Sequence, residues 1–197
     1  MRISVTLVAA AVIASSGWVY AWKATTAPKP NFVQSLERVG SRALWFGNNT
    51  ITGQFHISHG SPMWKEAYEG QLDTIPDGSR VRFGKDFWTT FETTIPVSIG
   101  GTRLEPDYYY LAIARNGDGL DLVAYQAARL REQRIGSFQP PQEGGAVIEM
   151  ALEKGERVED DLACDFVVDN TTGDVVLEIT WGPYTLSAPV VAELTTD

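Results

Sequence analysis

Apolar and polar residues alternate along most of the chain from Thr50 onward, which is the pattern that half-buried β-strands produce. In the first of these segments, Ile51, Phe55 and Ile57 alternate with polar residues, so one face of the strand is apolar. The same period of two predicts further strands in 86–99, 108–115, 120–126, 146–153, 162–169, 174–181 and 184–194.

The clearest hairpin joins 108–115 to 120–126 through the sequence NGDG, because asparagine and glycine adopt the positive φ values that tight turns need. Apolar residues at helical spacing predict two short helices, in 31–39 and in 127–136. About eight short strands with turn-forming residues between them predict a mainly β fold. We expect an antiparallel β-sandwich or jelly-roll-like domain with one or two short helices.

The first 22 residues differ from the rest of the chain, because Arg2 is followed by an uncharged run at 3–22. A basic start before an apolar run is typical of a secretory signal peptide, and this run is also long enough to span a bilayer. The predicted organisation is a signal peptide or membrane anchor at 1–22, a linker with a short helix at 23–49 and one β-sandwich domain at 50–197. We expect export to the periplasm or cell surface, with residues 3–22 as an inner-membrane tether if they are not cleaved.

The formal net charge is −9, which argues against nucleic acids and anionic membrane surfaces as partners, because like charges repel. The single cysteine, Cys164, excludes an intrachain disulfide. Cys164 lies on the same apolar face of a predicted strand as Leu162 and Phe166, so we expect it to be a core residue. A chain of 197 residues can build a core that needs no disulfide.

Several short motifs between residues 50 and 190 follow one another in a familiar order. Ser61-Pro62 ends a predicted strand, residues 82–90 match Arg-x-Gly-x-x-x-x-Thr-Thr, and a glycine-led hairpin motif follows from Gly101 to Tyr109. In these motifs the chain resembles the exported bacterial domain-of-unknown-function family 2911. The resemblance implies a small, exported, sheet-rich domain, and it implies no reaction, because no reaction is established for that family.

The sequence offers little for a metal site. His56 and His59 are the two histidines, and a spacing of three on a strand places them on opposite faces. A metal would also need a third ligand, for which the candidates are Glu66, Asp86 and Glu92. The oxygen-rich segments 116–121 and 169–174 lack the ligand spacing of a calcium loop and are predicted to be turns. We expect no metal and no cofactor.

Residues 82–92, RFGKDFWTTFE, form the segment with the most chemically active side chains. If the segment is a strand, Asp86 and Glu92 lie about 20 Å apart at ~3.3 Å per residue. Carboxylate pairs that hydrolyse glycosides are separated by roughly 5–9.5 Å, so these two acids are not expected to act together. No serine lies in a Gly-x-Ser-x-Gly motif. An enzyme is therefore the less favoured interpretation, and no catalytic residue is assigned.

Abundant aromatic residues favour a binding function, because exposed rings beside polar groups stack on sugars and contact partner chains. We predict a non-catalytic, exported cell-envelope module that binds a glycan, a peptide or an envelope protein. A structural envelope component is one alternative, and a hydrolase or metal-dependent enzyme around Arg82, Asp86, Glu92 and His59 is another. An Arg82–Asp86 ion pair that fixes the local turn is an alternative to ligand contact by these two residues. The candidate ligand-binding residues are Arg82, Asp86, Trp88, Glu92, Trp64 and Tyr109.

Overall fold

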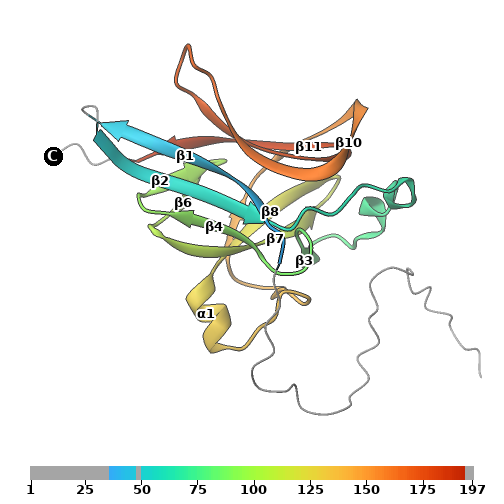
Figure 1. Ribbon diagram of the computed structural model, residues 1–197. Helices are drawn as coiled ribbons and strands as arrows, with labels where there is room; N and C mark the ends of the chain where they lie inside the picture. The colour runs from blue at the N-terminus through green and yellow to red at the C-terminus, as the bar shows by residue number, and fades with distance from the viewer. Residues whose placement is uncertain (1–35, 48–49, 194–197) are drawn as a thin grey trace, which may run out of the picture. The chain divides into compact units, whose positions relative to one another are not determined.

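The computed structural model describes residues 36–47 and 50–193, which belong to one structural unit that begins at Leu36 (Figure 1). The predicted signal peptide or anchor and most of the predicted linker and first helix lie outside the described residues. Among the described residues, no helix is both long enough and apolar enough to cross a membrane.

Two antiparallel sheets make up this unit, and the larger one has seven strands in the order β1-β2-β4-β7-β8-β9. β3 lies beside the second half of β7, where it continues the position that β4 occupies beside the first half. The strands are β1 (Val39–Gly47), β2 (Thr50–His59), β3 (Arg80–Arg82), β4 (Thr89–Thr93), β7 (Asp107–Asn116), β8 (Gly119–Gln126) and β9 (Ala146–Ile148).

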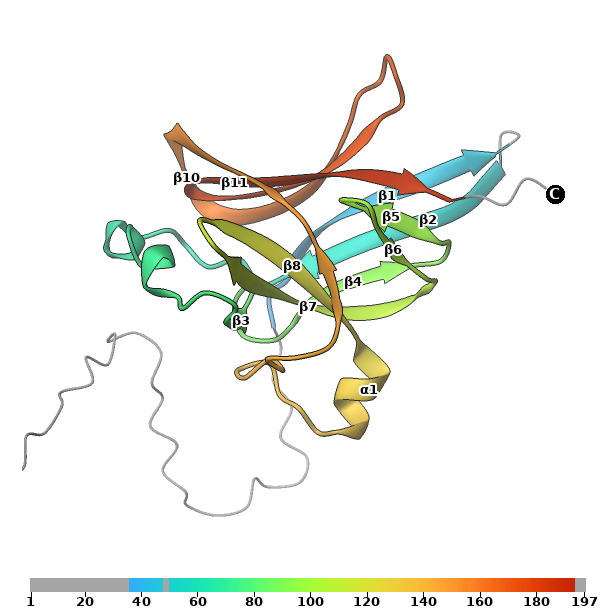
Figure 2. The same cartoon turned by 180° about the vertical axis from the view of Figure 1, so that it is seen from behind.

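The smaller sheet has four strands in the order β10-β11-β5-β6. Its main part is a long hairpin whose two strands have 18 residues each, and Figures 1 and 2 show this hairpin in orange and red across the larger sheet. The chain passes between the sheets at 94–96, 105–106 and 149–150. The strands are β5 (Val97–Ile99), β6 (Thr102–Leu104), β10 (Ala151–Val168) and β11 (Val175–Ala192). The predicted mainly β, sandwich-like fold is confirmed.

The main core lies between the sheets and is built by the period of two. Phe55 and Ile57 of β2 point inward together with Phe91 of β4, and Leu177 of the smaller sheet packs in the same cluster. Each such side chain contributes about 1.5–3 kcal/mol when it leaves water. Cys164 is 2% exposed in this core, and burial raises the pKa of its thiol well above the usual value. Its predicted structural role is confirmed.

A second, smaller cluster lies on the opposite face of the larger sheet. The helix α1 (Ala127–Glu132) lays Ala127 and Leu130 against Trp88, Tyr110 and Tyr125. β7 and β8 are therefore buried on both faces, which explains their almost continuous burial. The helix predicted over 127–136 is confirmed but ends earlier, and Arg134 follows with φ of 57°. The outer face beside this cluster carries polar side chains instead, among them Arg42 of β1, His56 of β2 and Glu92 of β4.

Some predicted elements are wrong in detail. The described end of the helix predicted over 31–39 has no helical structure, because Val39 starts β1 and pairs with His59. The strand predicted over 146–153 divides into β9 and β10, whereas the last two predicted strands merge into β11. Acidic residues 156–161 belong to β10, which is irregular there. The connection between β2 and β3 contains two 3-10 turns, η1 (Glu66–Tyr68) and η2 (Leu72–Thr74).

Candidate ligand-binding site

The segment 82–92 enters β4 through a sharp turn, and the strand begins only at Thr89. Gly84 has φ of 85° and Asp86 has φ of 67°, and the amide of Phe87 donates to the carbonyl of Lys85 across Asp86 at 2.9 Å. A Cβ on Gly84 would lie 2.6 Å from the hydroxyl oxygen of Thr89, so the turn leaves no space for a side chain there. Asp86 is thus a turn residue, and a separation computed along a strand does not apply to it.

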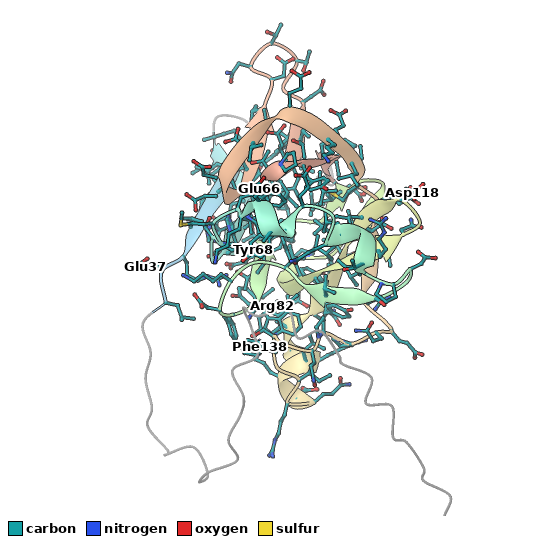
Figure 3. All side chains as sticks on the ribbon, turned by 90° about the vertical axis from the view of Figure 1, so that its right-hand side faces the viewer. Glu37, Glu66, Tyr68, Arg82, Asp118 and Phe138 are labelled. Atoms are coloured by element: carbon teal, nitrogen blue, oxygen red, sulfur yellow. The ribbon has the colours of Figure 1, made fainter. Side chains whose placement is uncertain are left out.

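Arg82 contacts this turn and the loop that follows α1. Its Nη1 donates to the main-chain carbonyl of Asp86 at 3.2 Å, and its guanidinium lies 4.6 Å over the ring of Phe138. Figure 3 shows Arg82 and Phe138 next to each other. Burial lowers the pKa of Arg82, and the charge of Asp86 opposes this effect. The Asp86 carboxylate also lies 4.0 Å from the ammonium of Lys85. These contacts hold the turn in place.

Two of the aromatic residues proposed from the sequence are core residues. Trp88 is 1% exposed and stacks on Tyr110 with ring centroids 5.2 Å apart and planes 5° apart. Tyr109 is 4% exposed, and its hydroxyl donates to the carbonyl of Glu105 at 2.8 Å. Trp88 thus lies in the cluster that α1 covers, and Tyr109 lies in the main core between the sheets, so neither ring is exposed at the surface.

Trp64 belongs to a separate aromatic group on the smaller sheet. Its ring centroid lies 4.9 Å from that of Trp181 and 6.0 Å from those of Tyr68 and Tyr184. The indole of Trp64 also covers Gly182, where a Cβ would lie 2.3 Å from the ring. Trp64 is half-buried and packs on β11, so it does not share a surface with the residues of β4.

His59 ends β2 on its inward face and is 1% exposed. Burial lowers the pKa of its imidazole, and Nδ1 lies 3.4 Å from the carbonyl oxygen of Gly60. His56 and Glu92 lie on the opposite, outward face, as the spacing of the histidines predicts. The enzymatic site suggested around Arg82, Asp86, Glu92 and His59 is therefore not assembled, because the sheet separates His59 from Glu92. Within the described residues, no three metal-ligating side chains form a cluster.

The outward face instead contains an open pocket of about 350 Å³ over β1, β2, β4 and β7. Its floor is a row of four side chains that the strand register places side by side: Arg42 opposes His56, His56 opposes Glu92, and Glu92 opposes Tyr108. Paired residues of neighbouring strands share a face, so all four point away from the core. Of the ligand-binding residues proposed from the sequence, Glu92 lines this pocket.

The four side chains of the row do not pair with one another through hydrogen bonds or ion pairs. None of them forms a hydrogen bond or an ion pair with another described residue, although their charges influence the titration of His56. Burial lowers the pKa of His56, the guanidinium of Arg42 lowers it further, and Glu92 raises it in part. At neutral pH the row therefore presents a cation, a neutral imidazole, an anion and a phenol in sequence.

Arg38 also lines the pocket. Its Nε donates to the hydroxyl of Ser58 at 3.2 Å, and its Nη2 donates to the carbonyl oxygens of Ser58 and Trp88. Nη1 is buried and has no hydrogen-bond partner in the described part of the chain. Burial lowers the pKa of Arg38, and Tyr108 and Asp86 oppose that effect. Arg38 is thus a fixed positive charge at the pocket.

Two aromatic rings, those of Phe87 and Tyr108, also line the pocket. Phe87 is 41% exposed and meets Tyr110 edge to face, with centroids 5.7 Å apart. Tyr108 meets Tyr110 in the same way at 5.9 Å. Tyr110 is itself buried and stacked on Trp88, so both rings pack against a buried neighbour. Phe87 and Thr90 complete the lining together with Ser58.

The sequence patterns missed most of this pocket. Arg38 and Arg42 fall in the segment predicted to be linker and helix, and the sequence predicts His56 to be a strand residue on the solvent face without assigning it to a ligand site. Arg42 and Leu44 do alternate with inward residues in β1, but the apolar contrast is too weak to predict a strand. The available signal was the alternation around His56 and Glu92, which places both on outward faces.

Comparison of the chain with protein-family models gave no match, and no match was found among curated proteins or solved structures. The similarity to domain-of-unknown-function family 2911 stays a prediction.

Proposed function

We propose that this protein is an exported, non-catalytic binding module of the bacterial cell envelope, and that its ligand lies in the pocket above Arg42, His56, Glu92 and Tyr108. The observation that carries the proposal is the row itself: four polar side chains in register on one open face, which form no hydrogen bond or ion pair with another described residue. Unpaired donors and acceptors on a rigid sheet are what a preformed binding site offers.

The position of the row in the sheet supports a binding role. β2 and β4 are internal strands that are paired on both sides. The side chains in the middle of the row, His56 and Glu92, therefore project from a rigid backbone. A rigid site loses little conformational entropy on binding. Among the described lining residues Glu92 is the one carboxylate, which suits recognition and does not supply the second acid that paired-carboxylate hydrolysis uses.

Export and the envelope location are proposed from the pattern of residues 1–22 and from the resemblance to an exported family. The acidic composition is compatible with a surface that repels nucleic acids and anionic headgroups. The partner is then an extracytoplasmic glycan, peptide or protein.

A panel of envelope glycans and peptides, probed with the purified protein, tests the proposal. We expect bound ligands to be lost when Arg42→Gln and Glu92→Gln are combined. Glu178→Gln on β11 is the matched control, because it removes a carboxylate from a strand of the smaller sheet, outside the pocket. Ligands that bind the double variant and the control equally well would show that the pocket is not the binding surface.

A further inference from the structure

We propose that the pocket recognises a sugar residue that carries a carboxylate, a uronic acid at the end or within an oligosaccharide. This inference rests on the proposed function, since it names the ligand class of the same pocket. It is carried by the order of charges along the row, by the exposed ring of Phe87 and by the way the strands beneath the pocket are paired.

The cationic end of the row provides the carboxylate site. Arg42 forms no hydrogen bond or ion pair with another described residue, so nothing in that part of the chain engages its guanidinium donors. Arg38 stands at the same pocket, fixed by Ser58 and Trp88. A guanidinium binds a carboxylate through two parallel charge-assisted hydrogen bonds, which are stronger than neutral ones.

The acidic part of the row determines the orientation. Glu92 lies two strands away from Arg42, at a Cα separation of about 10 Å for neighbouring strands ~4.8 Å apart. Its carboxylate repels the carboxylate of a ligand and accepts hydrogen bonds from hydroxyl groups. A uronic acid has its carboxylate at one end of the ring and hydroxyls at the other, so it fits with the carboxylate at Arg42 and the hydroxyls toward Glu92.

The polar groups between these two ends suit a polyhydroxylated ligand. The hydroxyl of Ser58 already accepts from Arg38, and Thr90 donates to the carbonyl of Ser58 at 3.3 Å. The neutral imidazole of His56 offers one donor and one acceptor. Sugar hydroxyls both donate and accept, so they match this mixture better than a purely anionic group such as phosphate does.

Phe87 supplies the apolar contact that a pyranose ring needs. The ring is 41% exposed at the pocket, while buried Tyr110 holds its edge. Aromatic rings stack on the C–H face of a sugar and exclude water from the neighbouring hydrogen bonds. Tyr108 also lines the pocket, and its ring packs against Tyr110 as the ring of Phe87 does.

The strand pairing argues against an extended peptide as the ligand. Peptides that bind to sheets add a strand to an open edge and use main-chain hydrogen bonds. Beneath the middle of the pocket, β2 pairs with β1 and β4, and β4 pairs with β2 and β7, so their main-chain groups are already used, whereas β1 lies at the edge of the sheet. A ligand above His56 and Glu92 therefore binds through side chains, as sugars do.

The net charge of −9 repels an acidic ligand at long range, but the pocket itself holds two arginines against Glu92. Salt screens the distant repulsion more strongly than contacts inside the pocket. We therefore expect affinity to depend only weakly on ionic strength.

Calorimetric titration of the full chain tests the inference, with a glucuronate-terminated oligosaccharide, its methyl ester and the matching glucose-terminated oligosaccharide as probes. We expect the ester and the neutral sugar to bind about tenfold more weakly or worse, because a hydrogen bond to a charged group contributes about 1.5–3 kcal/mol. Arg42→Gln removes the preference for the acid, so that the acid and the neutral sugar bind with equal affinity, and Glu178→Gln keeps the wild-type preference.

The other outcomes separate this inference from the proposed function. Equal binding of acid and neutral sugar in wild type and Arg42→Gln overturns the carboxylate inference, whereas the pocket remains a glycan site. Tighter binding of a glutamate-rich peptide also overturns it and keeps the binding module. If no glycan, peptide or envelope protein binds the pocket, both proposals fail. Thermal unfolding of each variant confirms that the fold is intact.

Discussion

His56 and Glu92 oppose each other across β2 and β4 on the outward face of the larger sheet. They are neighbours in a row that Arg42 and Tyr108 complete, so the imidazole lies between a cation and an anion. The titration of His56 therefore reports the electrostatics of the whole pocket.

The pKa of His56 lies below its ordinary value because burial and Arg42 outweigh Glu92. We expect Arg42→Gln to raise this pKa and Glu92→Gln to lower it, since each variant removes one of the two opposing charges. NMR titration of the imidazole protons measures both shifts, and His56→Asn assigns the signal. If the pKa of His56 is the same in both variants as in wild type, the arrangement of the row is contradicted.

His59 gives folding stability a pH dependence of predictable sign. Burial lowers its folded-state pKa, so the unfolded chain binds more protons between the folded value and the ordinary value of about 6.5. Stability is therefore fully present above about pH 6.5 and is lost as the pH falls through the folded pKa.

Urea unfolding at about pH 7.5 and about pH 5.5 measures this effect. His59→Gln should lose less stability between the two pH values than wild type. His56→Gln is the matched control, with a smaller change because His56 is half-buried. Equal pH dependence in wild type and His59→Gln would exclude His59 as the source.

Arg38 and Arg42 line the same pocket but differ in their bonds. Arg38→Ala removes the donors to the carbonyls of Ser58 and Trp88, and we expect a loss of about 1–3 kcal/mol in the free energy of unfolding. Arg42→Ala should stay within about 0.5 kcal/mol, because it breaks no contact of this kind. Denaturant unfolding of the two variants compares them directly, and equal losses would contradict the anchoring of Arg38.

Trp88 and Phe87 are adjacent in sequence and differ in burial. Trp88→Ala should cost about 3–5 kcal/mol, because it empties the cluster beneath α1. Phe87→Ala should cost less than about 1.5 kcal/mol, since its ring is partly exposed. The same Phe87 variant should weaken binding of the acidic sugar severalfold. If the Trp88→Ala protein folds normally and binds the acidic sugar weakly, the ligand contacts Trp88, which would contradict the role given to Phe87.

The turn before β4 needs glycine at position 84 for two reasons. Gly84→Ala introduces a Cβ at positive φ and places it 2.6 Å from the Thr89 hydroxyl. Gly173→Ala, at φ of 80° with nothing within 4 Å, introduces only the backbone strain. We expect Gly84→Ala to be the more destabilising by at least about 1 kcal/mol. Urea midpoints of the pair measure the difference, and equal midpoints would show that the turn relaxes freely.

The sheets were predictable because alternation is a local property of the chain. Phe55 and Ile57 alternate with polar residues, which is enough to predict the buried face of β2. The hairpin at 116–119 is predicted by its own turn residues. β1 was missed because its outward and inward residues differ little in polarity, and its strand form depends on pairing with β2.

The pocket was less predictable because it depends on register between distant strands. Arg42 and Tyr108 are 66 positions apart and meet in one row only through the intervening pairs. The period of two places Trp88 and Glu92 on the same face of the sheet. It did not show that α1, from much later in the chain, covers one and leaves the other open.

Amide NMR mapping of the bound glucuronate-terminated oligosaccharide tests the central claim most directly. The account predicts shifts concentrated at Arg42, His56, Glu92 and Tyr108, with little change at Trp64. Shifts centred on the aromatic group of Trp64, or no shifts at the row at ligand saturation, would contradict it.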